Sequence, residues 1–142
     1  MSKIKEVRAE IAALLVADTE LTTTLQVHTY ASRQLPGRFE RELCVFSGGS
    51  APERGAVLGG GNYGAFYQYV LLWLIKFETD ELAAAEDVSD DVEQVIYRVL
   101  LEENKRHTLW SKLVFPGISL RPVAPGGTQN AHYGRTVVRI NI

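Results

Sequence analysis

The segment from Ala65 to Glu78, AFYQYVLLWLIKFE, constrains the fold of this chain most strongly. We expect an extended strand much longer than the typical five or six residues. Its two alternating faces are both apolar or aromatic, with Phe66, Val70, Leu72 and Leu74 on one and Tyr67, Tyr69, Leu71, Trp73, Ile75 and Phe77 on the other. Helices packed on one side of a sheet cover only one face. The second face is therefore covered by other parts of the chain or by a neighbouring subunit, and the sequence leaves both readings open.

Two other segments have the pattern of amphipathic helices. Apolar residues recur at spacings of three, four and seven through the first segment, which predicts a helix over residues 3–17. The threonine-rich stretch 19–24 is expected to end it, because β-branched and short polar residues disfavour helical hydrogen bonding. Asp90 and Glu93 have the spacing of a capping box, so we predict that a second helix begins there. Its buried stripe would be Val92, Val95, Ile96 and Val99, with Lys105, Arg106 and His107 at its end.

The remaining apolar runs predict further strands over residues 25–30, 41–47, 113–123 and 132–142, of which the last two pair as a hairpin. Residues 48–63, GGSAPERGAVLGGGNY, contain six glycines and predict a mobile hairpin loop. The order of elements predicts one α+β domain over residues 1–142. It would contain a mainly antiparallel sheet, an N-terminal helix and a second helix packed on one face, and a long β-hairpin arm.

Composition and charge exclude some classes of function. The formal charge of −2 and the pI of about 5.9 are poorly suited to a protein that binds nucleic acid by neutralising many phosphates. The first residues mix charges of both signs with apolar residues, so we expect no signal peptide. The single cysteine, Cys44, can form no disulfide within the chain. We therefore expect a soluble protein that folds in a cytoplasm.

One candidate cofactor motif is present. Residues 59–64, GGGNYG, match the dinucleotide-binding pattern G-x-G-x-x-G. A predicted strand follows the motif, whereas pyrophosphate binding needs the N-terminus of a helix. We therefore interpret the motif as part of a hairpin tip and expect no cofactor.

Candidate catalytic and metal-binding residues are scattered. Cys44 and the histidines His28, His107 and His132 lack the spacing of a nucleophile–base pair or a metal site, and Cys44 is expected to pack as a small hydrophobic side chain. Neighbouring acids such as those at positions 90 and 91 point about 100° apart on a helix and do not converge on a metal ion. We expect neither a catalytic centre nor a metal site.

The order of elements, the glycine-rich hairpin loop and the closing segment 133–142, YGRTVVRINI, together resemble the tail terminator, or tail completion, proteins of long-tailed bacteriophages. The resemblance covers nearly the whole chain and is one of pattern. It implies a structural subunit that forms a ring, usually a hexamer, on the end of the tail tube. Such a ring stops tube polymerisation and joins the tail to the head or neck.

The resemblance also implies partners and a location. The partners would be copies of the chain, the tail tube protein and a head–tail connector or neck protein, while genomic DNA passes through the ring without specific binding and no membrane takes part. The protein would be assembled in the host cytoplasm and would reside in the virion, at the head-proximal end of the tail.

A closed ring needs two unlike patches on each subunit, and charge can supply them. Residues 78–93 contain eight acidic residues and no basic one, so they are candidates for one patch or for the lining of a DNA channel. The candidate basic residues are Arg33, Arg38, Arg41, Arg135 and Arg139. The residues predicted to contact other subunits or the tube are Arg38, Arg41, Arg54, Asn62, Tyr63, Tyr67, Tyr69, Trp73, Asp80, Glu81, Glu86, Asp87, Arg135 and Arg139.

Other functions stay open at this point. The same pattern fits other neck or head-completion proteins of the same particle. A different class is a module that binds a small molecule or peptide in a pocket between sheet and helices, lined by Tyr67, Tyr69 and Trp73. A third is a small hydrolase or nuclease that uses acids or Cys44 in a geometry the sequence does not reveal.

Overall fold

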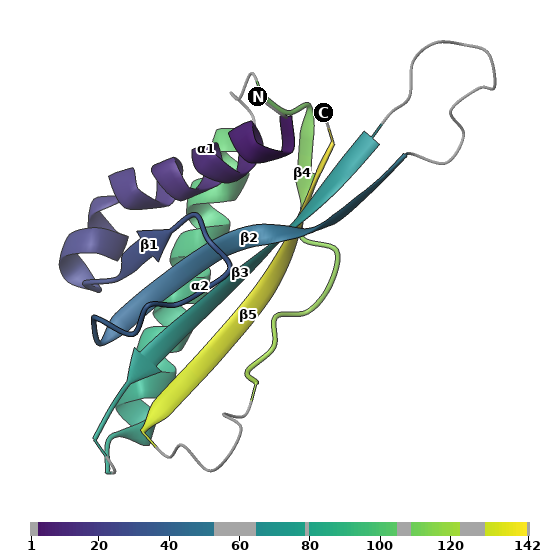
Figure 1. Ribbon diagram of the computed structural model, residues 1–142. Coiled ribbons are helices and arrows are strands. Elements are labelled where there is room, and N and C mark those ends of the chain that lie inside the picture. The colour runs from purple at the N-terminus through teal and green to yellow at the C-terminus, as the bar shows by residue number, and fades with distance from the viewer. Residues whose placement is uncertain (1–2, 53–64, 79, 105–108, 123–129, 142) are drawn as a thin grey trace, which may run out of the picture.

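A single five-stranded sheet organises the computed structural model of this chain, which describes residues 3–52, 65–78, 80–104, 109–122 and 130–141. The spatial order of the strands is β1-β2-β3-β5-β4, and the sheet lies in front of helix α2 in Figure 1. The strands are β1 (His28–Tyr30), β2 (Arg41–Pro52), β3 (Ala65–Lys76), β4 (Lys112–Val114) and β5 (Ala131–Asn141). The predicted α+β class is confirmed.

The N-terminal helix α1 (Lys3–Ala17) has the predicted bounds, and its buried residues include Val7, Ile11 and Leu15. Each such side chain contributes on the order of 1.5–3 kcal/mol by leaving water. The threonine-rich stretch ends α1 as expected and then forms a π-helical turn, η1 (Glu20–Thr24). The Asp18 carboxylate accepts a hydrogen bond from the backbone N–H of Leu21 at 3.0 Å, which satisfies a donor at this turn.

The second helix, α2 (Leu82–Asn104), is longer than predicted. The prediction that it begins near Asp90 is wrong, because the acid-rich segment before Asp90 is itself helical. Ala83, Ala84 and Ala85 have the highest helix propensity of any residue type. The buried residues of this first part, Ala85 and Ser89, are small and weakly apolar, so no hydrophobic stripe marked it in the sequence. The basic residues predicted at its end, 105–107, lie outside the described residues.

Strands β2 and β3 form the predicted long hairpin arm. They pair antiparallel from Arg41 opposite Ile75 to Pro52 opposite Ala65, and their distal ends project beyond the helical layer in Figure 1. The predicted loop 48–63 therefore starts too early, since residues 48–52 belong to β2. A bulge between Ser47 and Gly49, where Gly49 adopts a φ of +118°, absorbs the glycines without ending the strand. The rest of the predicted loop, 53–63, lies outside the described residues.

Two strands at the sheet edges are shorter than predicted. The strand expected over residues 25–30 is reduced to β1, and it pairs parallel to β2, so the sheet is mainly but not wholly antiparallel. The strand expected over residues 113–123 is reduced to β4, with one isolated bridge at Leu120. Pro116 lacks the N–H that a continuing ladder needs, which explains the interruption. β4 pairs antiparallel with β5, as expected.

Strand β5 has the predicted alternation. Thr136, Val138 and Ile140 are buried on the helix side, while Arg135 is exposed and Arg139 half-buried on the other. Gly134 lies beneath the Trp73 indole, and a Cβ built on it would be 2.0 Å from Cε2 of that ring. None of the helices in the described part of the chain has the length and apolarity needed to cross a membrane.

Candidate interaction surface

The two faces of β3 have different surroundings. On one face, the Tyr69 hydroxyl donates a hydrogen bond to the Ile4 carbonyl of α1 at 2.8 Å, and Trp73 Nε1 donates one to Ser89 Oγ of α2 at 2.7 Å. Both helices therefore cover this face. The opposite face, which carries the even-numbered residues of β3, is the one on which neither helix lies. We call it the open face.

The centre of the open face is apolar. Val70 is paired with Phe46 of β2 and with Val137 of β5, and Leu72 is the next residue of β3 on this face. All four side chains are half-buried, whereas the core residues that alternate with them are fully buried. We call Phe46, Val70, Leu72 and Val137 the apolar floor.

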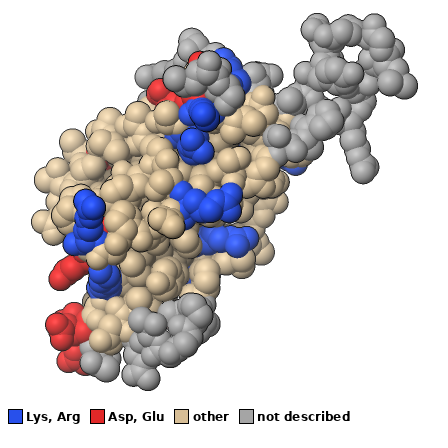
Figure 2. All heavy atoms as spheres, in the orientation of Figure 1, with Lys and Arg blue, Asp and Glu red and all other residues tan. Residues whose placement is uncertain are grey.

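Arginines surround the apolar floor. The Arg33 guanidinium lies 4.9 Å from the centroid of the Phe46 ring, and that of Arg139 lies 5.1 Å from the centroid of Phe66, both cation–π contacts. Arg135 is opposite Leu72, and its side chain forms no hydrogen bond or ion pair with any described residue. Figure 2, in which the sheet again lies in front, shows Lys and Arg side chains across the centre of this view and Asp and Glu side chains toward its margins. We call Arg33, Arg135 and Arg139 the arginine rim.

One end of the open face is closed by the segment between β1 and β2. The Glu42 carboxylate is fully buried and accepts hydrogen bonds from the Tyr30 hydroxyl at 3.0 Å and from the Gly37 and Arg38 backbone N–H groups at 2.7 and 3.3 Å. A buried carboxylate is stable only when such donors compensate its lost hydration. Glu42 thus fixes this segment over one end of the sheet, and burial together with the bond from Tyr30 raises the pKa of the Tyr30 hydroxyl.

The predicted basic residues divide between two places. The structure brings Arg135 and Arg139 together on the open face, where Arg33 joins them. Arg41 lies elsewhere, because its Nη1 donates a hydrogen bond to the Leu25 carbonyl at 2.8 Å, and Arg38 is exposed on the segment held by Glu42. The predicted acidic residues Asp80, Glu81, Glu86 and Asp87 are all exposed, at or near the N-terminal end of α2.

The predicted aromatic contacts need correction. Tyr69 and Trp73 are fully buried in the core beneath the helices, so they are available neither to another subunit nor to the pocket predicted between sheet and helices. Tyr67 is half-buried and packs against the same core. The face of β3 that carries these aromatic residues is apolar because the chain's own helices cover it. Arg54, Asn62 and Tyr63 lie outside the described residues.

An ionic cluster that the sequence did not reveal joins the segment before β5 to α2. Arg121 Nη2 lies 2.7 Å from Glu93 Oε2 and 3.1 Å from Asp90 Oδ1, and the Arg121 guanidinium lies 5.3 Å from the centroid of the Trp73 ring. Burial alone would raise the pKa of Glu93, but hydrogen bonds from Ser119, Arg121 and Tyr97 outweigh it and lower that pKa. Nothing in the spacing of these residues marks them as partners.

Cys44, His28 and His132, the catalytic candidates that the structure describes, are not grouped into a site, and His107 lies outside the described residues. Cys44 is fully buried, as expected for a small hydrophobic side chain, and burial raises its pKa to about 11, so its thiol is not a nucleophile near neutral pH. His132 lies on β5, and its pKa is lowered, mainly by burial. Within the described ranges, no three His, Cys, Asp or Glu residues are grouped so that they could hold a metal ion.

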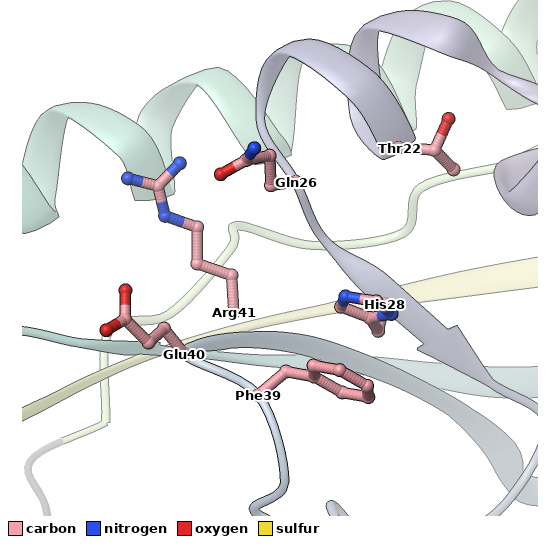
Figure 3. Close-up of a pocket in the computed structure, with 6 residues that line it drawn as sticks. All are labelled: Thr22, Gln26, His28, Phe39, Glu40 and Arg41. Carbon is pink, nitrogen blue, oxygen red and sulfur yellow. The ribbon is translucent and has the colours of Figure 1, made fainter.

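A separate pocket of about 420 Å³ lies beside β1 (Figure 3). The His28 ring stacks on the Phe39 ring, with centroids 3.6 Å apart, and forms one wall. The Gln26 and Arg41 side chains lie on the other side, and Gln26 has a φ of 55°, a strained conformation for a residue other than glycine. The described residues that line the pocket are Thr22, Gln26, His28, Phe39, Glu40 and Arg41. The pocket is polar and open, and it holds no activated nucleophile.

The comparisons with known proteins do not extend this description. No protein-family model matches the chain, and no curated protein matches it.

Proposed function

We propose that this chain is a non-enzymatic structural subunit that forms a ring, as a homohexamer, on the end of a phage-type tail tube. The ring ends tube polymerisation and joins the tail to the head or neck of the virion. The observation that carries the proposal is the half-covered sheet, in which two helices cover one face while the apolar floor and arginine rim form the other. Apolar surface bounded by charged side chains is typical of protein–protein contact sites.

Self-assembly accounts for the open face better than enclosure within the subunit. The segment held by Glu42 reaches only one end of this face, and the Arg33 side chain extends from it over Phe46. The exposed Leu120 pairs with Arg135 in an isolated bridge, which places a further apolar side chain beside the arginine rim. A neighbouring subunit that covers the floor would remove this apolar surface from water and stabilise the assembly.

The hairpin arm supports the same proposal. β2 and β3 are 12 residues long each, and their paired distal ends extend past the helices (Figure 1). An arm of this kind offers surface to a neighbouring subunit or to the tube protein without disturbing the core. The proposed partners are therefore other copies, the tail tube protein and a connector or neck protein, with DNA passing through the ring unbound.

The test uses purified protein and tail tubes from the same particle. Mass photometry across concentration, with and without tubes, should reveal rings, and electron microscopy should show the protein at one tube end with tube growth arrested. Protein found only at the connector would favour a different neck or head-completion role. A strict monomer that leaves tube ends unoccupied and tube length unchanged contradicts the proposal.

A second candidate function, binding of a small polar ligand, rests on the pocket beside β1. Backbone strain such as that at Gln26 is concentrated at functional sites in proteins. Calorimetric titration with small carboxylates and phosphates tests this function. Absence of heat at millimolar ligand would exclude such binding.

A further inference from the structure

Helix α2 carries an exposed strip of carboxylates on its N-terminal half. Glu86 and Asp90 are four residues apart, as are Asp87 and Asp91, so each pair lies close together on the helix surface, and the two pairs form adjacent rows about 100° apart. All four residues are exposed. Leu82 lies four residues before Glu86 on the same surface and is 47% exposed. We call these five residues the acidic strip.

The acidic strip is electrostatically unfavourable in the isolated subunit. Like charges four residues apart on a helix each cost roughly 0.2–0.5 kcal/mol, and the strip has two such pairs. The helix dipole offsets negative charge only in the first turn, whereas α2 begins at Leu82 and the carboxylates start at Glu86. Among the described residues, only Asp90 of the strip has a cationic partner, Arg121 at 3.1 Å.

We infer that the acidic strip of one copy docks on the open face of the next copy, an inference that rests on the proposed self-assembly. The strip supplies carboxylates where the open face supplies guanidinium groups, and Arg135 in particular has no anionic partner among the described residues. Leu82 supplies an apolar side chain where the open face supplies the apolar floor. Both charge and hydrophobicity are therefore complementary.

The positions of the two surfaces determine the type of assembly. The open face is the side of the sheet away from the helices, whereas α2, which carries the exposed acidic strip, packs against the opposite side of the sheet (Figure 1). One copy cannot bring its own strip onto its own open face. The contact is therefore heterologous, each copy uses both surfaces, and repetition gives a closed ring or an open filament.

Two reciprocal charge reversals test the inference. The first variant carries Arg135→Glu and Arg139→Glu on the open face. The second carries Asp87→Lys and Asp91→Lys on the acidic strip, two carboxylates that form no ion pair within the described residues. Glu102→Lys, at an exposed position in the C-terminal half of the same helix, is the matched control. Circular dichroism establishes that each variant is folded, and mass photometry measures assembly.

Each double variant should assemble at least roughly tenfold more weakly than the wild type, because attraction is replaced by repulsion at two positions. The Glu102→Lys control should assemble like the wild type. An equimolar mixture of the two double variants should recover assembly, since the acidic strip of the first variant matches the open face of the second and the reversed surfaces match each other. Assembly of the wild type should also weaken as salt rises.

The outcomes separate the inference from the proposed function. Double variants that assemble like the wild type, or a mixture that does not recover, overturn the docking of strip on face while leaving self-assembly intact. If the mixture recovers assembly but wild-type rings do not bind tube ends, the docking is supported and the tail function is contradicted. DNA and the tube protein are also added to the protein separately. The inference is overturned if the arginine rim binds either of them and does not bind a second copy.

Discussion

Replacing Gly134 with alanine should destabilise the protein more than any other single methyl addition at a described glycine. Three atoms of the Trp73 indole lie within 2.2 Å of the position that the new Cβ would occupy. Carbon atoms at van der Waals contact are about 3.5–4.0 Å apart. The indole must therefore move by well over 1 Å, although Trp73 is fully buried and its Nε1 is bonded to Ser89 of α2 at 2.7 Å.

The expected loss follows from two terms. Forcing an extra carbon into a packed core costs about 1–3 kcal/mol. Displacing the indole also breaks its hydrogen bond and leaves a buried donor or acceptor unsatisfied, which costs about 1–3 kcal/mol more. The Gly134→Ala variant should thus lose roughly 2–6 kcal/mol in the free energy of unfolding, a large part of the stability of a domain of this size.

Urea unfolding followed by tryptophan fluorescence measures this loss. Gly117→Ala is the matched control, because no atom lies within 4 Å of a Cβ built there, and it should change the free energy of unfolding by less than about 0.5 kcal/mol. A Gly134→Ala variant as stable as its control would refute the packing of Trp73 between β5 and α2.

Three further predictions concern buried or paired groups. Glu42→Gln removes the charge that accepts three hydrogen bonds and should lower the free energy of unfolding, measured in urea, by about 1–3 kcal/mol. Glu40→Gln at an exposed position should change it little, and equal effects would contradict the role given to Glu42. The lowered pKa of Glu93 contributes stability that is present above its unfolded pKa of about 4.5 and is lost as pH falls through the folded pKa. Glu93→Gln should therefore flatten the curve of stability against pH in that acidic range, and an unchanged curve would count against the pairing with Arg121. Cys44, whose pKa is raised to about 11, should resist thiol reagents at pH 8 until urea unfolds the chain, and rapid labelling of the native protein would contradict its burial.

Elements with a strong hydrophobic period were predictable from the sequence. The recurrence of apolar residues in 3–17 fixed α1 at both ends, because one stripe of the helix faces the core. The strict alternation near the C-terminus likewise predicted β5 and its two faces. In both cases a single buried face imposes its period on the residues.

Other features depended on contacts between distant residues. The start of α2 was missed because its first buried residues, Ala85 and Ser89, are too small to produce an apolar stripe. The open face could not be located because β3 is apolar on both sides, and only the positions of the helices show which side is covered. The cluster of Arg121 with Glu93 joins residues 28 apart in sequence, a distance at which no local pattern operates.

Cryo-electron microscopy of the wild-type protein added to tail tubes from the same particle tests most directly whether copies of the chain cover one another's open face in a ring. We expect a ring at one tube end in which the apolar floor and the arginine rim of each copy are covered by its neighbour. A tube end without a ring, or a ring in which the open face remains in contact with solvent, would contradict this expectation.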